Sequence, residues 1–137
     1  MNIRVMLADS HEQYRDALCM ALEQETDISV VAQAGSDLAA LEAMTRVPVH
    51  VVCLDVRIAV LGGIETTRLL LQRFPHVRVI GLSIHDDPEL VRGMIGAGAS
   101  AFVLKMDVGR DLPLVIRRVR YDKTYGSQSM PRIVGTV

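Results

Sequence analysis

The sequence predicts an α/β fold: a doubly wound, five-stranded parallel sheet covered by helices in a three-layer (βα)5 sandwich. The first observation behind this prediction is the run 51–55, where four consecutive apolar residues are typical of a central strand buried on both faces. The second is that strand-like and helix-like segments alternate five times, which favours crossovers between parallel strands. The third is composition, because 137 residues with 50% hydrophobic and 23% charged side chains suit one globular domain.

Four of the five expected strands end at a polar side chain. These side chains are Asp9, Asp55, Ser83 and Lys105, at the ends of the first, third, fourth and fifth strands. The predicted strand order is the flavodoxin-like 2-1-3-4-5, in which ligands bind outside the carboxyl ends, at the switch between the first and third strands. Two acids, a hydroxyl and an amine are therefore expected close together at the carboxyl edge of the sheet. The strands are expected at 3–8, 28–34, 51–55, 77–82 and 101–104.

Capping residues mark where the five expected helices begin. Ser10 and Gln13 have the S-x-x-Q spacing of a capping box before the first helix. Ser36 is expected to cap the second helix, and Asp87, which is followed by a proline, the fourth. Pro113 fits the last helix only within its first turn. The helices are expected at about 11–25, between Ser36 and Pro48, at 64–74, at 88–96 and from about 111 onward.

Charge and cysteine content indicate which binding surfaces and which cellular compartment to expect. The 15 Lys and Arg against 16 Asp and Glu give a formal net charge of -1, which indicates neither a nucleic-acid surface nor a membrane surface overall. Two cysteines without paired spacing favour a reducing compartment. No apolar run approaches the roughly 20 residues of a membrane span, so we expect a cytoplasmic protein without a membrane partner.

The two strand-end acids point to phosphoryl chemistry. Asp9 and Asp55 would repel each other unless a cation joined them, and the small, hard Mg²⁺ ion prefers oxygen ligands. A carboxylate can attack a phosphoryl group and form an aspartyl-phosphate, while a metal ion and an amine neutralise the phosphoryl oxygens. Lys105 and Ser83 are placed for such contacts. Each residue alone is explained by capping or solvation, so their joint occurrence at successive strand ends carries the prediction.

Several motifs are similar to those of one known family. Residues 2 to about 126 resemble the receiver domain of bacterial two-component response regulators, in particular the NarL/FixJ class that carries a LuxR-type helix-turn-helix. The motifs keep their spacing without gaps. They are 8–11 (A-D-S-H against A-D-D-H), 52–55 (V-C-L-D against V-L-L-D), 82–87 (L-S-I-H-D-D against L-T-x-H-D-D), 96–105 (G-A-G-A-S-A-F-V-L-K against R-A-G-A-S-G-Y-L-L-K) and 124–125 (T-Y in both).

The resemblance implies a phosphoacceptor and a metal site. Asp55 would take a phosphoryl group from a partner histidine kinase. Asp9, Asp55 and the backbone carbonyl of Arg57 would hold Mg²⁺. Ser10 stands where the family usually has its second acid, and its hydroxyl is a neutral and weaker ligand, so a lowered Mg²⁺ affinity is expected.

The resemblance also implies how the signal leaves the site. Ser83 would sense the phosphoryl group, Lys105 would pair with it, and Phe102 would be the aromatic side chain whose inward swing reports it. A local charge would then bias a loop and a helix that have two arrangements, and so switch protein–protein contacts. The expected partners are the kinase and a second copy of the chain in a homodimer.

The chain departs from the family in the loop after Asp55. The family shows M-P-x-M-D-G there, whereas this sequence has Ala59 and Gly62 in place of the proline and the aspartate, which predicts a more flexible and less polar loop. One alternative is therefore a degenerate receiver that signals without phosphorylation. A small aspartyl-phosphate phosphotransferase or phosphatase is disfavoured because no second acid is placed for general acid–base work, so the chain is not expected to be an enzyme. A flavin-binding domain is disfavoured because the residues after the first strand are acidic.

The expected domain organisation is a receiver over residues 1–123 and a tail, or the start of a linker to an absent helix-turn-helix domain, over 124–137. Control of transcription would run through that DNA-binding domain, and DNA binding by these residues themselves is not expected. The histidines at 11, 50 and 76 share no metal-binding spacing. His85 with the two aspartates after it is explained by helix capping and solvent exposure.

Overall fold

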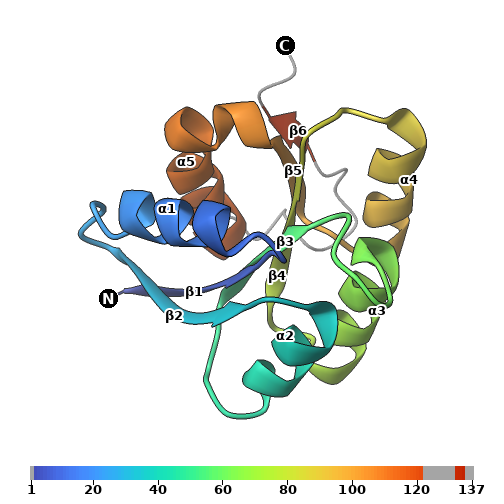
Figure 1. Ribbon diagram of the computed structural model, residues 1–137, viewed down its shortest axis with the longest axis horizontal. Coiled ribbons are helices and arrows are strands. Elements are labelled where there is room, and N and C mark those ends of the chain that lie inside the picture. Colours follow the sequence, from blue (N-terminus) through green and yellow to red (C-terminus); the bar gives the residue numbers. More distant parts are fainter. Residues whose placement is uncertain (1, 122–131, 135–137) are drawn as a thin grey trace.

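The computed structural model describes residues 2–121 and 132–134, and its strands form one parallel sheet (Figure 1). The strands are β1 (Ile3–Ala8), β2 (Ile28–Ala34), β3 (Val51–Asp55), β4 (Arg78–Ser83), β5 (Ala101–Leu104) and β6 (Arg132–Val134). They are ordered β2-β1-β3-β4-β5-β6, with every neighbouring pair parallel. The predicted order 2-1-3-4-5 is confirmed for the first five strands.

The strand β6 is an element that the sequence did not predict. It extends the sheet beside β5, with Phe102 opposite Ile133 in the register. It lies within 124–137, the range assigned to a tail or linker, and most of that range, including Thr124 and Tyr125, falls outside the described residues.

Helices cover both faces of the sheet and give the predicted three layers. Figure 1 shows α1 and α5 on one face and α2, α3 and α4 on the other. None of the described helices is both long and apolar enough to cross a membrane. The helices are α1 (Glu12–Leu22), α2 (Asp37–Met44), α3 (Gly63–Arg73), α4 (Pro88–Ala97) and α5 (Val108–Tyr121), with a 3-10 turn η1 (Lys105–Asp107) before α5.

The strand β3 is apolar at four consecutive positions because each of its faces is covered by helices. Val51 and Cys53 belong to the core formed with α1 and α5, whereas Val52 and Leu54 belong to the core formed with α2, α3 and α4. All four side chains are at most 1% exposed. The Cys53 thiol is a packing group, and burial raises its pKa to about 12.

Two of the three predicted helix caps are confirmed. The Ser36 hydroxyl accepts a backbone N–H of α2 at 3.1 Å, and the Asp87 carboxylate accepts one of α4 at 3.0 Å. The prediction for Ser10 was wrong, because α1 begins one residue later, after His11, and Ser10 is exposed. A carboxylate accepts the orphaned N–H instead: Asp9 Oδ1 receives the backbone N–H of His11 at 2.8 Å.

The start predicted for the last helix was also wrong. Helix α5 begins at Val108 and follows η1 directly, so Pro113 lies inside the helix rather than in its first turn. The proline removes one backbone hydrogen bond, which is unfavourable in a helix interior. Apolar side chains at helical spacing offset this loss by packing against the sheet, and they are Leu112, Val115, Ile116 and Val119.

The loop between β3 and α3 receives its polar contacts from a distant residue. The carboxylate of Asp37, at the start of α2, is fully buried and accepts three consecutive backbone N–H groups, those of Val60 (2.8 Å), Leu61 (2.6 Å) and Gly62 (3.0 Å). The backbone N–H of Asp37 in turn donates to the carbonyl of Ala59 at 3.2 Å. The less polar loop expected from the sequence is thus tied to α2 by a side chain outside it.

Candidate functional site

Two buried aspartates and one lysine meet at the carboxyl edge of the sheet. Asp9 and Asp55 are 3% and 6% exposed. The ammonium group of Lys105 lies 2.7 Å from Asp9 Oδ2 and 3.6 Å from Asp55 Oδ1. A buried carboxylate is unfavourable unless it is paired, and here one cation faces two of them. The predicted convergence of these three residues is what the structure shows.

The register of the sheet explains why these side chains meet. Ala8 lies opposite Leu54, so the residues that follow each of them, Asp9 and Asp55, lie side by side at the switch between β1 and β3. In the same way Ser83 lies opposite Leu104, which places Lys105 just beyond the end of β5. The cluster is therefore a consequence of where parallel strands stop.

His11 joins this cluster, although its sequence spacing did not indicate a metal site. Its Nδ1 lies 3.2 Å from Asp9 Oδ1, and ligand atoms of Asp9, His11 and Asp55 all lie within 4.8 Å of one another. The His11 side chain is 75% exposed. The available signal was its place two residues after a strand-end aspartate, at the turn into α1, which returns the ring toward the carboxylate.

The ring of Tyr14 lies beside the ammonium group of Lys105 in the cluster. The ammonium group of Lys105 lies 4.5 Å from the centre of the Tyr14 ring, within the range of a cation–π contact. Burial raises the pKa of the Tyr14 hydroxyl, and the negative charge of Asp9 raises it further. The hydroxyl is buried and, among the described residues, has no hydrogen-bond partner. Tyr14 was not among the predicted site residues.

Of the remaining predicted site residues, Arg57 contacts Asp55, whereas Ser83 and Phe102 have their described contacts elsewhere. The Ser83 hydroxyl is buried and hydrogen-bonds within its own loop, donating to the His85 carbonyl at 2.7 Å and accepting the His85 N–H at 3.2 Å. The Arg57 backbone N–H donates to Asp55 Oδ1 at 3.3 Å. Phe102 is 2% exposed and packs over Gly81, where an added Cβ would lie 3.3 Å from the ring. Ser10 is exposed.

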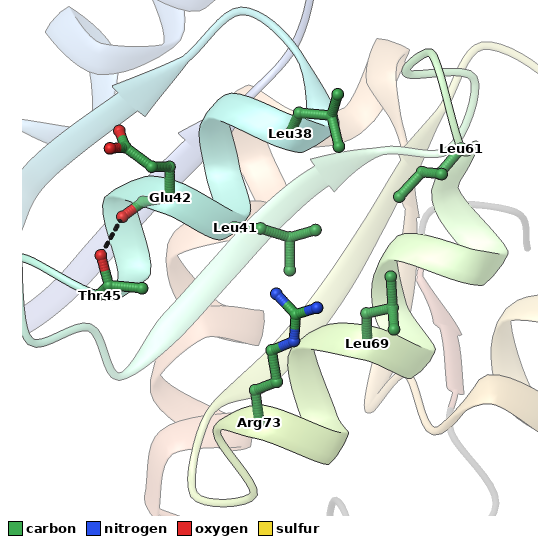
Figure 2. A pocket seen from close by; sticks show the side chains of 7 residues that line it. All are labelled: Leu38, Leu41, Glu42, Thr45, Leu61, Leu69 and Arg73. Atoms are coloured by element: carbon green, nitrogen blue, oxygen red, sulfur yellow. Dashed lines mark hydrogen bonds between the residues drawn. The ribbon is translucent and has the colours of Figure 1, made fainter.

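A separate groove of about 450 Å³ lies between α2 and α3 (Figure 2). Figure 2 shows the side chains of Leu41, Leu61 and Leu69 facing it, with the guanidinium group of Arg73 beside Leu41. None of the residues that line this groove is a predicted site residue. They are Leu38, Leu41, Glu42, Thr45, Leu61, Leu69 and Arg73.

Comparison with known proteins agrees with the arrangement of the cluster. Residues 5–117 match the response regulator receiver domain. The chain belongs to this family. Its fold is also that of the signal receiver domain of the putative response regulator NarL from Mycobacterium tuberculosis, with a TM-score of 0.76, 26% identity, and coverage of 85% of this chain and 97% of that one.

The similar curated proteins are transcriptional regulators. This receiver is 30% identical over 96% of its length to the transcriptional regulatory protein DegU of Brevibacillus brevis. It is 38% identical over 85% of its length to the DNA-binding transcriptional activator DevR/DosR of Mycobacterium tuberculosis. In both comparisons the matched part is 54% of the relative, so the chain spans about half the length of these proteins.

Proposed function

We propose that this receiver domain is controlled by phosphorylation, with Asp55 taking a phosphoryl group from a partner histidine kinase. The observation that carries the proposal is the buried Asp9–Lys105–Asp55 cluster, with the Lys105 ammonium 2.7 Å from Asp9 and 3.6 Å from Asp55. An oxygen of the Asp55 carboxylate attacks phosphorus, an O–P bond forms, and the N–P bond to the kinase histidine breaks. The freed imidazole nitrogen regains its proton.

Lys105 has two tasks in this scheme. In the resting domain its ammonium group offsets the charges of Asp9 and Asp55, which are both buried. When the phosphoryl group is attached, the same ammonium group lies within reach of the new oxygens and neutralises part of their charge. A cation held between two partners can change partner without leaving the site.

The donor set of the cluster fits a divalent cation. Asp9 and Asp55 supply carboxylate oxygens close to each other, and the backbone carbonyl of Arg57 is the third ligand implied by the family resemblance. When bound, Mg²⁺ would neutralise charge on the phosphoryl oxygens. The exposed Ser10 contributes at most a neutral hydroxyl, so Mg²⁺ affinity is expected to be lower than with an acid at this position.

The Ser83 hydroxyl is proposed to convert phosphorylation into a change of shape. Its hydrogen bonds with His85 hold the loop between β4 and α4. A phosphoryl oxygen on Asp55 would compete for this hydroxyl and release the loop, while the buried ring of Phe102 repacks beside it. The altered surface would change contacts with a second copy of the chain. By analogy with DegU and DevR/DosR, the output is control of transcription through a DNA-binding domain of a longer protein.

The proposal is tested by incubating the protein with Mg²⁺ and acetyl phosphate and measuring its intact mass. We expect one added phosphoryl group in the wild type and in Asp86→Asn, an exposed acid on the neighbouring loop, and none in Asp55→Asn. Oligomeric state is measured in the same samples, with a larger dimer fraction expected after phosphorylation. An unmodified wild-type mass would contradict the proposal and favour a receiver that signals without phosphate.

A further inference from the structure

We propose that the groove between α2 and α3 is a docking site for an acidic amphipathic helix of another protein. The groove has a volume of about 450 Å³, and its lining combines leucine side chains with the guanidinium group of Arg73. None of its lining residues belongs to the Asp9–Lys105–Asp55 cluster. The inference therefore goes beyond the proposed function and does not depend on phosphorylation.

Leucine side chains give the groove an apolar surface that is only partly covered. Leu38 and Leu61 are 54% and 40% exposed, whereas Leu41, at 6%, lies at the base of the groove. Figure 2 shows Leu38 and Leu61 toward one end of the groove and Arg73 reaching in from the other. Exposed leucines that gather in one hollow, unlike single ones scattered over a surface, are typical of a protein interaction site.

Arg73 gives the groove a positive charge that the chain itself does not neutralise. This arginine is exposed and takes part in no ion pair among the described residues. Two acids of α2 and α3 already have partners close by in the chain, namely Glu42 with Arg46 and Glu65 with Arg68. A carboxylate on a partner would therefore meet a cation without a competing acid, and charge complementarity of this kind sets partner choice and orientation.

A second hollow, of about 350 Å³, also has Arg73 in its lining and extends toward the amino edge of the sheet. Its other basic side chains are His50 and His76, and apolar residues such as Met44 make up the rest of its lining. Among the described residues that line the two hollows, Glu42 is the only acid. The surface on both sides of Arg73 thus combines apolar and basic groups, which favours an acidic partner over a basic one.

The shape of the groove suits a short helix. Helices α2 and α3 both return from the carboxyl edge of the sheet to its amino edge, so they run in the same direction on either side of the groove. Helix α3 has 11 residues, which is about 16 Å at about 1.5 Å per residue. A partner helix of about three turns covers this length and presents apolar side chains at i, i+4 and i+7 to the leucines.

A second copy of the chain matches the groove less well. Its α1 carries the exposed acids Glu12 and Asp16, but Met20 is the only large apolar side chain that this described helix exposes. One such side chain cannot cover a groove with several leucines. The occupant that fits both the leucines and Arg73 is therefore a helix with its own apolar stripe and a carboxylate near its end.

The test uses a synthetic peptide of about three helical turns, with leucines at i, i+4 and i+7 and a glutamate at each end, and a second peptide with lysines in place of the glutamates. Each is titrated into the isotope-labelled protein while amide chemical shifts are recorded. We expect the acidic peptide to shift amides of α2, α3 and the loop before α3, and to bind at least roughly tenfold more tightly than the basic peptide.

Two variants with matched controls assign the binding to the groove. Arg73→Glu should reverse the preference between the peptides, whereas Arg92→Glu, at an exposed arginine of α4, should leave it unchanged. Replacing Leu38 and Leu61 together with serine should weaken binding of the acidic peptide at least roughly tenfold. Leu114→Ser is the control for this change, because Leu114 on α5 is 55% exposed and lies outside the groove.

Three results would overturn the inference. The first is that millimolar acidic peptide shifts no amides of α2 and α3, and the second is that the two peptides bind equally well. The third comes from sedimentation of the protein alone: self-association that is lost when Leu38 and Leu61 are replaced would make a second copy the occupant. None of these measurements requires phosphorylation, so their outcome is independent of whether Asp55 accepts a phosphoryl group.

Discussion

Asp37 and Asp9 are both buried aspartates at the turn from a strand into a helix, yet their charges are satisfied by different kinds of group. Three backbone N–H groups of the β3–α3 loop donate to Asp37. Asp9 accepts a single backbone N–H, that of His11, and otherwise faces the side chains of Lys105 and His11. Backbone donors cannot leave without unfolding the loop, whereas side chains can rotate away. The kind of partner, rather than burial, distinguishes a structural carboxylate from one available for chemistry.

Two histidines repeat this contrast. The half-buried His50 accepts the backbone N–H of Arg4 through Nδ1 at 2.9 Å, so its nitrogen has a fixed donor. His11 is 75% exposed and its Nδ1 approaches the carboxylate of Asp9. The ring of His50 is thus held by the backbone at the amino end of the sheet, whereas the exposed ring of His11 contacts a carboxylate at the carboxyl end.

The largest expected effect is that of removing the Asp37 carboxylate. Asp37→Ala leaves three partly buried N–H groups without an acceptor. A fully buried group of this kind costs about 1–3 kcal/mol, and the lower end of that range applies to a loop that water can reach, so we expect the free energy of unfolding to fall by about 3 kcal/mol in total. Urea denaturation measures this. If Asp37→Ala lost no more stability than Asp86→Ala, an exposed control, the structural role of Asp37 would be refuted.

A smaller loss is expected when the cation of the cluster is removed. Lys105→Met leaves Asp9 and Asp55 facing each other, and breaking a fully buried ion pair costs about 3–5 kcal/mol. Because the site opens to water on the side of His11, we expect a loss of about 2 kcal/mol in unfolding free energy. Addition of Mg²⁺ should recover part of it, as seen by thermal unfolding with and without the ion. No response to Mg²⁺ would contradict the assignment of these two carboxylates as a metal site.

Replacing an aspartate with asparagine in the Asp9–Lys105–Asp55 cluster and at Asp37 compares the two regions most directly. Asp55→Asn removes one of two repelling charges, so we expect stability within about 1 kcal/mol of the wild type. Asp37→Asn replaces one accepting oxygen with an NH₂ group that cannot accept, and we expect a larger loss of about 1–2 kcal/mol. Equal losses of stability in the two variants would contradict the proposed difference between the two carboxylates.

The smallest effect concerns pH and His50. Burial, together with the positive charges of Arg120 and Arg4, lowers the pKa of His50 below its usual 6.5 in the folded state. The folded state therefore favours the neutral ring, and its contribution to stability is complete above about pH 6.5 and lost as pH falls through the lowered pKa. His50→Asn keeps an acceptor for the Arg4 N–H and should flatten the stability profile below pH 6.5. An unchanged profile would show that His50 is not its source.

The elements that could be predicted were those specified by local pattern. The apolar run of β3 and the polar residues at strand ends placed Asp9, Asp55 and Lys105 together, because the geometry of parallel strands determines where those ends lie. The caps Ser36 and Asp87 could be predicted because their hydrogen bonds reach only two or three residues along the chain.

The features that were missed depend on contacts between distant segments or on competition between neighbouring groups. Asp37 contacts a loop more than 20 residues away, and nothing in its local sequence indicates that partner. Helix α1 begins after His11 rather than after Ser10, and the backbone N–H of His11 donates to the side chain of Asp9. The strand β6 has only three residues and exists through its pairing with β5.

The most direct test of the central claim is to locate the phosphoryl group after reaction with acetyl phosphate. Reduction with borohydride converts an aspartyl-phosphate to homoserine, and peptide mass spectrometry then identifies the modified position. We predict homoserine at Asp55 alone, with Asp9 and Asp37 unmodified. Modification at Asp9, or at an exposed acid with Asp55 unchanged, would contradict the account of the cluster as a site built around Asp55.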